Sequence, residues 1–358
     1  MSNCHILSIT DSGKWNQYLK QLPIDQQDVY FTPEYYSLYE ANGDGKALCF
    51  VFEHDSEIAL YPFLINRIND LGYDLDDEYF DIQGAYGYNG VVSSSYNDDF
   101  KRLFHERFRE YAVENNIVCE FLRVNPLLPN FLMDCGSYSF VRVNTTYATN
   151  LNAQDILYEE YEHSARKNIN KAKLEGLDVV FYEYPGSKLD HLIEFLKIYE
   201  DTITRRSAEE YYFFCKDYFT ALLGNPSIVS RLYFCENNGK KISTEIVLIG
   251  PKYAYSFLGG TLCEYFKQRP NDYLKHTIIS DLKQIGLDRF VLGGGNEDRD
   301  GISRYKKSFA KKSFMDFYIC YNIYNDNIYN SLLRGWEMRF PELRSKYGKR
   351  VLRYRETN

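Results

Sequence analysis

The chain runs twice through the same order of expected elements, and this recurrence restricts it to folds built from two similar units. In each half, helices come first, two apolar strands joined as a hairpin follow, and a strand, a loop, a helix and another strand complete the passage. The hairpin strands are expected at residues 47–53 and 58–65 in the first half, and at residues 228–236 and 240–249 in the second. No repeat is visible at the level of single residues, so only the order of elements recurs.

The length allows a separate core for each half, because 358 residues correspond to about two domains of average size. Hydrophobic residues make up 44% of the chain, which excludes wholesale disorder. We therefore expect an N-terminal unit over residues 1–150, a second unit over residues 151–325, and a basic helical tail over residues 326–358.

Composition also excludes several classes of protein. No apolar run reaches the roughly 18 residues needed to cross a bilayer, and the first 20 residues lack the basic and apolar segments of a secretory signal. We therefore expect a cytoplasmic protein with at most peripheral membrane contact. The eight cysteines form no C-x-x-C pair and the six histidines show no ligand spacing, so reduced cysteines and no metal are expected.

Charge is distributed unevenly along the chain. Residues 1–150 hold 10 basic against 22 acidic side chains, whereas residues 301–358 hold 13 against 5. A net charge of −8 argues against general nucleic-acid binding. The basic end could meet phosphates of a nucleotide, an RNA or a lipid head group, or only water.

Several segments depart from the regular pattern and carry glycine, aromatic or basic residues. Three glycines within seven residues at 84–90 exclude an ordinary helix there. In chain order, these segments are Tyr86-Gly87-Tyr88-Asn89-Gly90, the basic helix 164–172 running into Gly176, Tyr199 with Thr202 and Arg205, Arg269-Pro270-Asn271 before the helix 271–285, and Gly293-Gly294-Gly295 leading to 301–306.

Taken in this order, the segments resemble the Fem-type aminoacyl transferases, which extend peptidoglycan side chains, and the wider group of acetyltransferase-like proteins. The resemblance implies an α/β (α+β) fold of two tandem GNAT-like units, each with a mixed, bent sheet flanked by helices. No 50-residue heptad segment is present, so the long helical insertion of some relatives is not expected.

The same resemblance implies an enzyme that moves an aminoacyl or acyl group onto an amine of a cell-envelope precursor, either a peptidoglycan peptide or an amino sugar. The donor would be aminoacyl-tRNA or acyl-CoA, with no tightly bound cofactor, and the acceptor a small or nucleotide-linked precursor. Two rivals stay open: an acyl-CoA-dependent N-acyltransferase of polysaccharide synthesis, and a non-catalytic carbohydrate- or precursor-binding protein.

Lys306 is the first catalytic candidate, because it occupies the position that resembles the family's active-site lysine, whose cation stabilises developing negative charge. A solvated lysine is the plain alternative, and Lys307 is the alternative in register. Tyr305 would wall the pocket or simply pack in the core. Asp300 or Glu297 would serve as general base.

The remaining candidates would bind substrate or donor. Solvated helix faces, structural turns and structural ion pairs are the alternatives for them. The expected substrate-binding residues are Tyr86, Tyr88, Asn89, Arg166, Lys171, Arg205, Tyr211, Gly294 and Asn296. For the donor, only Arg269 and Asn271 are left of a coenzyme A loop, at a helix start without a glycine cradle.

Overall fold

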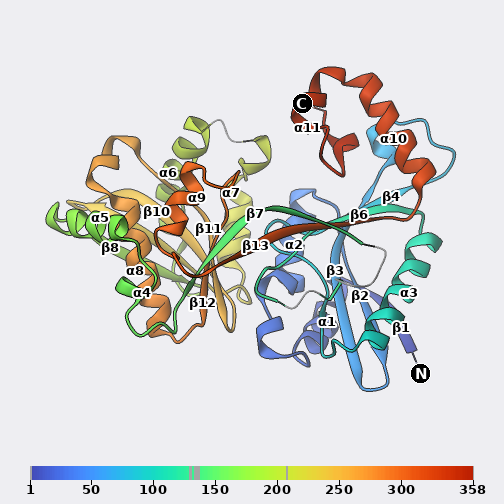
Figure 1. Cartoon of the computed structure of the whole chain (residues 1–358), viewed down its shortest axis with the longest axis horizontal. Coiled ribbons are helices and arrows are strands. Elements are labelled where there is room, and N and C mark those ends of the chain that lie inside the picture. Colours follow the sequence, from blue (N-terminus) through green and yellow to red (C-terminus); the bar gives the residue numbers. More distant parts are fainter. Residues whose placement is uncertain (1, 129–130, 133–137, 207–208, 358) are drawn as a thin grey trace. The chain divides into compact units, whose positions relative to one another are not determined.

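The structure, a computed structural model, describes residues 2–128, 131–132, 138–206 and 209–357. It divides into two compact units (Figure 1). The first unit comprises Met1–Arg142 together with Tyr318–Asn358, and the second comprises Val143–Phe317.

The first unit is built on a sheet with the strand order β1-β2-β3-β4-β6-β13, and β5 pairs with β3. β4 and β6 are parallel, and the other pairs are antiparallel. Its strands are β1 (Ser2–Ser8), β2 (Lys46–His54), β3 (Glu57–Arg67), β4 (Phe80–Gln83), β5 (Val92–Ser93), β6 (Ile117–Arg123) and β13 (Phe314–Ile323). Its helices are α1 (Ser12–Leu19), α2 (Pro33–Asn42), α3 (Asp98–Glu114), α10 (Asp326–Arg339) and α11 (Arg344–Tyr347).

Local sequence explains the main helices of this unit. The Thr32 hydroxyl accepts the Tyr35 N–H at the start of α2, and Gly43, with φ +89°, ends that helix. The α3 helix presents phenylalanines at the spacing of one helix face to alternate residues of β2 and β3. This packing of α3 on the sheet forms the core of the first unit.

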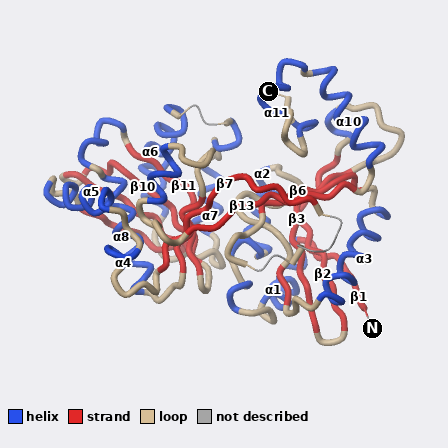
Figure 2. Tube along the Cα trace, viewed as in Figure 1, coloured by secondary structure: helices blue, strands red, loops and turns tan. Residues whose placement is uncertain are grey.

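The second unit has the strand order β7-β12-β11-β10-β9-β8, and Figure 2 shows its strands flanked by helices. β11 and β12 are parallel, and the other pairs are antiparallel. Its strands are β7 (Ser139–Asn150), β8 (Asp178–Tyr184), β9 (Ser230–Asn237), β10 (Lys240–Ile249), β11 (Tyr253–Thr261) and β12 (Arg289–Gly293). Its helices are α4 (Ile156–Glu159), α5 (His163–Leu174), α6 (Leu192–Arg205), α7 (Lys216–Gly224), α8 (Pro270–Gln284) and α9 (Gly301–Lys307).

The two sheets follow one plan with one exchange. Each has four antiparallel strands, a parallel fifth and an antiparallel sixth. In the first unit the sixth strand is β13, from near the end of the chain, whereas β7, which follows β6 in sequence, pairs with β12 of the second unit. The units have therefore exchanged their last strands, so the expected boundaries at residues 150 and 325 differ from the division observed.

Two glycines lie inside a strand rather than in a turn. Gly259 and Gly260 belong to β11, where a Cβ on Gly259 would meet Thr244 O at 2.3 Å and one on Gly260 would meet Thr202 Oγ1 at 2.4 Å. These glycines permit close packing of the strand against its neighbours.

The basic tail expected over residues 326–358 packs within the first unit. Asp81, fully buried on β4, accepts hydrogen bonds from Tyr354 OH at 2.6 Å and from Arg355 Nε and Nη2 at 2.7 and 2.9 Å. Trp336 of α10 is also fully buried. The end of the chain is thus anchored by a buried ion pair.

Among the described helices, none has the length and apolar character needed to span a bilayer. The described cysteines are free, and they differ in exposure. Those in the core are Cys49, Cys119, Cys235 and Cys320, whereas Cys4, Cys215 and Cys263 are exposed. Cys135 lies outside the described residues.

Replacing Arg355 with Met should lower the free energy of unfolding of the first unit by about 3 kcal/mol, because Asp81 would stay buried without its ionic partner. Both tryptophans of the chain, Trp15 and Trp336, belong to this unit, so tryptophan fluorescence in a urea series reports its unfolding. Arg344→Met, at an exposed position of the same tail, is the control and should change stability by less than about 0.5 kcal/mol. Equal losses in both variants would contradict the anchoring role of Asp81.

Candidate functional site

The parallel strands β11 and β12 part after a short common stretch. They pair only from Tyr253 to Tyr255 of β11, although that strand continues to Thr261. The register between β10 and β11 skips Phe257, so β11 carries a bulge just beyond the last residue that pairs with β12. A bulge bends its strand, which accounts for the divergence.

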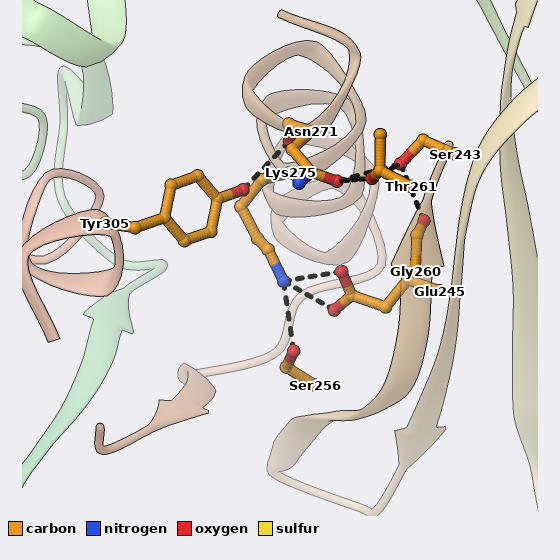
Figure 3. Close-up of polar contacts among 8 residues, drawn as sticks. All are labelled: Ser243, Glu245, Ser256, Gly260, Thr261, Asn271, Lys275 and Tyr305. Atoms are coloured by element: carbon orange, nitrogen blue, oxygen red, sulfur yellow. Dashed lines mark hydrogen bonds and ion pairs between the residues drawn. The ribbon is translucent and has the colours of Figure 1, made fainter. Parts of the chain in front are cut away.

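A buried ion pair lies where the strands part. The Lys275 ammonium of α8 donates to both carboxylate oxygens of Glu245 at 2.6 Å and to Ser256 Oγ at 3.0 Å (Figure 3). Ser256 is the first residue of β11 beyond the stretch paired with β12. Lys275 and Glu245 are 5% and 8% exposed, so the two charges satisfy one another largely away from water.

A second polar network ties α9 to the first turn of α8. The Tyr305 hydroxyl donates to Asn271 O at 3.0 Å, and the Asn271 side-chain oxygen accepts from the Ser243 and Thr261 hydroxyls (Figure 3). Arg205 Nη2 in turn donates to Thr261 O at 3.1 Å. Residues from α6, β10, β11, α8 and α9 therefore meet at the end of β11.

Lys306 lies next to Tyr305 on α9, and its Nζ donates to Gly294 O at 2.6 Å. Burial and the nearby Lys275 ammonium lower the pKa of Lys306 from 10.5 to about 8, although Glu245 acts in the opposite direction. An ammonium of this kind releases its proton far more readily than a solvated lysine does.

The glycine-rich turn after β12 fits closely against its surroundings. Gly293 has φ +76°, and a Cβ on Gly294 would meet Thr145 O at 2.8 Å. Only glycine therefore leaves the carbonyl of residue 294 in position for Lys306. The turn is a tight structural element that also presents a backbone acceptor.

Asp300 caps α9 and is not suited to act as a general base. Its carboxylate accepts the Ser303 N–H at 2.6 Å and the Asn296 N–H at 2.8 Å. Burial raises the pKa of Asp300, but the hydrogen bonds from backbone N–H groups outweigh burial and the net shift is downward. The Asn296 side chain itself is exposed.

Other predicted residues of the second unit do not join this network. Arg166 donates to the carbonyls of Leu157 at 2.9 Å and Tyr161 at 2.8 Å, which is a structural use of its side chain. Lys171 is exposed on α5, and Tyr211 is 40% exposed. Arg269, at φ +65°, precedes α8 and is exposed.

The predicted residues Tyr86, Tyr88 and Asn89 belong to the first unit. Asn89 is buried, its Nδ2 donates to Ala85 O at 2.7 Å, and its Oδ1 accepts the Arg123 N–H at 3.1 Å. Tyr86 O accepts a hydrogen bond from Tyr35 OH, and the Tyr88 ring meets that of Tyr30 edge to face. The glycine and tyrosine loop is thus held by internal contacts.

Sequence reasoning missed Glu245 and Lys275, although a signal for them exists. Glu245 directly precedes the apolar run 246–249 of β10, and Lys275 lies among the core-facing positions of α8. A charged residue at a core position is rarely buried without a partner, so two of them predict a pair. No group of three or more metal-ligating side chains occurs among the described residues.

The stability of the protein should depend on pH through Lys306. Between about pH 7 and about pH 9.5 the folded chain loses a proton that the unfolded chain keeps, so wild-type stability should rise by about 2 kcal/mol relative to Lys306→Met. Urea unfolding followed by circular dichroism measures this difference. Lys307→Met, at the exposed neighbouring position, should show no such trend. A difference between wild type and Lys306→Met that does not vary with pH would contradict the lowered pKa.

Comparison with known proteins finds a family match for part of the chain and solved structures with a similar fold. Residues 163–307 match the family described as acetyltransferase (GNAT) domain, and a search of curated proteins finds no match. The solved structure of FemX is similar with a TM-score of 0.66 at 13% identity, covering 91% of this chain and 99% of that chain.

Two more solved structures extend the likeness over most of the chain. A tandem GNAT protein from the clavulanic acid biosynthesis pathway has a TM-score of 0.51 at 11% identity, covering 90% of this chain and 98% of that one. The C-terminal domain of a protein assigned as a lysylphosphatidylglycerol synthetase, from Agrobacterium fabrum, has a TM-score of 0.55 at 13% identity, covering 93% and 96%. The expected α/β fold with GNAT units is thereby confirmed, and the chain is an acyltransferase of the GNAT fold.

Proposed function

We propose that the chain transfers an aminoacyl or acyl group onto an amine of a cell-envelope precursor, with Lys306 as the catalytic residue. The observation that carries this proposal is the Lys306 ammonium, held by Gly294 O at 2.6 Å within the matched domain. The charges of the buried Lys275–Glu245 pair act on this ammonium.

The reaction needs both a cation and a proton at this position. The acceptor amine attacks the acyl carbonyl, a C–N bond forms, and negative charge develops on the carbonyl oxygen, which the Lys306 ammonium stabilises. When the bond to the leaving oxygen or sulfur breaks, Lys306 gives that atom a proton and recovers one from the newly bonded nitrogen. A lysine with a pKa of about 8 suits this exchange at neutral pH.

The start of α8 favours a donor other than coenzyme A. A helix start binds a pyrophosphate through free N–H groups, but Pro270 at the first position of α8 has none. Asp272 adds a buried carboxyl group to this first turn. An aminoacyl ester of tRNA requires no such cradle, and it is our first choice of donor.

The acceptor follows from the order of motifs and from the similarity to FemX. The Fem-type resemblance implies a peptidoglycan peptide or an amino sugar, supplied as a small or nucleotide-linked precursor. Such a precursor and a charged tRNA are both cytoplasmic, so the proposal keeps the protein in the cytoplasm. Peripheral membrane contact enters only if the acceptor is lipid-linked.

An acyl-CoA-dependent N-acyltransferase is the second candidate. It is favoured by the match of residues 163–307 to a family described as acetyltransferase. The two candidates differ in the donor alone, so one assay separates them.

That assay incubates the purified chain with nucleotide-linked muramyl peptides or amino sugars and with either a charged tRNA mixture or acetyl-CoA. Product is followed by mass spectrometry, and ligand binding by the melting temperature, which a ligand of the native state must raise. Product from charged tRNA supports the first candidate, and product from acetyl-CoA supports the second. No product and no thermal shift with any ligand would contradict both.

Lys306→Met should lower kcat about 100- to 1,000-fold, because both the charge and the proton are lost. In the wild type kcat should fall above about pH 8, where the ammonium loses its proton. Lys306→Arg should retain part of the activity without this decline, because arginine stays charged. The control Lys307→Met should stay within about twofold of wild type. Activity lost in Lys307→Met but kept in Lys306→Met would assign the role to the neighbouring lysine.

A further inference from the structure

The basic end of the chain, which the acyl-transfer reaction leaves without a role, is part of a folded surface. Tyr347 is 5% exposed and Tyr354 is fully buried, and both belong to a core that also holds Trp336 of α10. The Trp336 Nε1 group donates to Glu356 O at 2.7 Å. The residues after α10 are therefore held against that helix, and their outward side chains have fixed positions.

This surface differs in charge from the rest of its unit. Residues 1–142 hold 10 basic against 22 acidic side chains, whereas residues 326–358 hold 8 against 4. Asp74 and Asp76 lie beside the first half of α10, where they line one pocket together with Ser331. The excess of positive charge therefore belongs to the later part of α10 and to the residues that follow it.

Four of the eight basic side chains use their charge inside the unit. Arg355 pairs with Asp81 at 2.7 Å. Three more contact a carboxylate or backbone carbonyls, and they are Arg339, Arg350 and Arg353. The remaining four are exposed, and within the described part of the chain they form no ion pair: Arg334, Arg344, Lys346 and Lys349.

A tight turn gathers the charges that follow α10. The Gly348 N–H donates to Arg344 O at 3.0 Å, and a Cβ on Gly348 would meet that oxygen at 2.5 Å, so the turn accepts only glycine. The Lys346 ammonium and the Arg350 guanidinium each lie 4.5 Å from the centroid of the Tyr347 ring. Like charges held this close to one ring repel one another, and a bound anion would relieve that repulsion.

A large apolar side chain lies close to these charges in the chain. Met338 is 80% exposed, and it follows Arg334 by one turn on the same face of α10. The phosphates of an RNA offer no apolar contact to such a side chain, and the buried Tyr347 ring is not open for stacking on a base. A bilayer offers anionic head groups and acyl chains together. The combination therefore fits a lipid surface better than an RNA.

We propose that the first unit docks on an anionic lipid membrane through a basic surface formed by Arg334, Met338, Arg344, Lys346 and Lys349. The basic side chains contact lipid phosphates, and Met338 inserts at the boundary between head groups and acyl chains. Two weak signals of this kind give reversible binding. Docking does not depend on the proposed reaction, but if both hold, the acceptor is a lipid-linked precursor.

The test measures binding of the purified full chain to vesicles by sedimentation, with no substrate present. Phosphatidylcholine vesicles with about 30% phosphatidylglycerol should bind the protein, and vesicles of phosphatidylcholine alone should not. The surface variant combines Arg344→Gln, Lys346→Gln and Lys349→Gln. It should bind the anionic vesicles about 100-fold less tightly, because each basic side chain near such a surface contributes about a fivefold factor.

A matched control removes the same charge elsewhere in the same unit. It combines Lys20→Gln, Lys46→Gln and Arg109→Gln, three exposed positions outside the basic surface. This control should bind within about twofold of wild type, because charges far from the membrane are screened. If circular dichroism shows that the surface variant does not fold, wild-type binding in about 0.5 M salt decides. Binding that survives this salt would contradict the proposal.

Met338→Trp tests the depth of contact and separates a lipid from an RNA. Trp15 and Trp336 are fully buried, so the added indole reports the exposed position. Its emission should shift to shorter wavelength on anionic vesicles and should be quenched by lipids with brominated acyl chains. A charged tRNA mixture should cause neither change.

Three results would overturn the proposal. They are a wild type that leaves anionic vesicles unbound, an equal loss of binding in the surface variant and the matched control, and a Met338→Trp variant that binds vesicles without quenching. Binding of tRNA that only the surface variant loses, with vesicles unbound, would assign the basic surface to RNA instead. An enzyme inactive on every acceptor would refute the proposed function and leave docking standing.

Discussion

The site depends on the point where β11 stops pairing with β12. Parallel strands that separate stop sharing backbone hydrogen bonds, and beside this point Lys275 of α8 donates to Ser256 of β11 and to Glu245 of the neighbouring strand β10. The bulge at Phe257 bends β11 at the same place, so the ion pair and the divergence support one another. The Tyr305 hydroxyl on Asn271 then fixes α9, and with it Lys306, against this framework.

Much of the fold could be predicted because its strands and helices obey local rules. The Asn237-Asn238-Gly239 turn, the Thr32 cap and the phenylalanine face of α3 each act within a few residues, and the structure has the corresponding hairpin and helices. The first strand, β1, and the late strand β13 were not predicted, since their half-exposed patterns carry little periodic signal. Strand exchange could not be predicted at all, because pairing between strands about 200 residues apart leaves no trace in local sequence.

A candidate site residue could be predicted where it belongs to a sequence motif. It could not be predicted where only tertiary packing brings it to the site. Lys306 follows a glycine-rich turn, and the structure gives it a half-buried position with a backbone acceptor. Arg166 carries the same charge in an equally basic segment, yet its side chain donates hydrogen bonds to backbone carbonyls just before α5. Both side chains are half-buried, so the difference lies in the groups around them: Arg166 meets carbonyls close in sequence, whereas charges from β10 and α8 act on Lys306. Glu245 and Lys275 were not predicted because each is stabilised by the other, and the two lie 30 residues apart in sequence.

The exchange of β7 and β13 affects the order in which the two sheets can form during translation. β6 obtains its second neighbour only from β13, almost 200 residues later in the chain, so the sheet of the first unit emerges with an unpaired edge. The second unit, by contrast, has its sixth strand before any of its others, because β7 is made first. An open strand edge during synthesis invites pairing with other nascent chains. The order of translation therefore completes the unit that holds Lys306 first and leaves the N-terminal sheet to close last, when the end of the chain reaches Asp81.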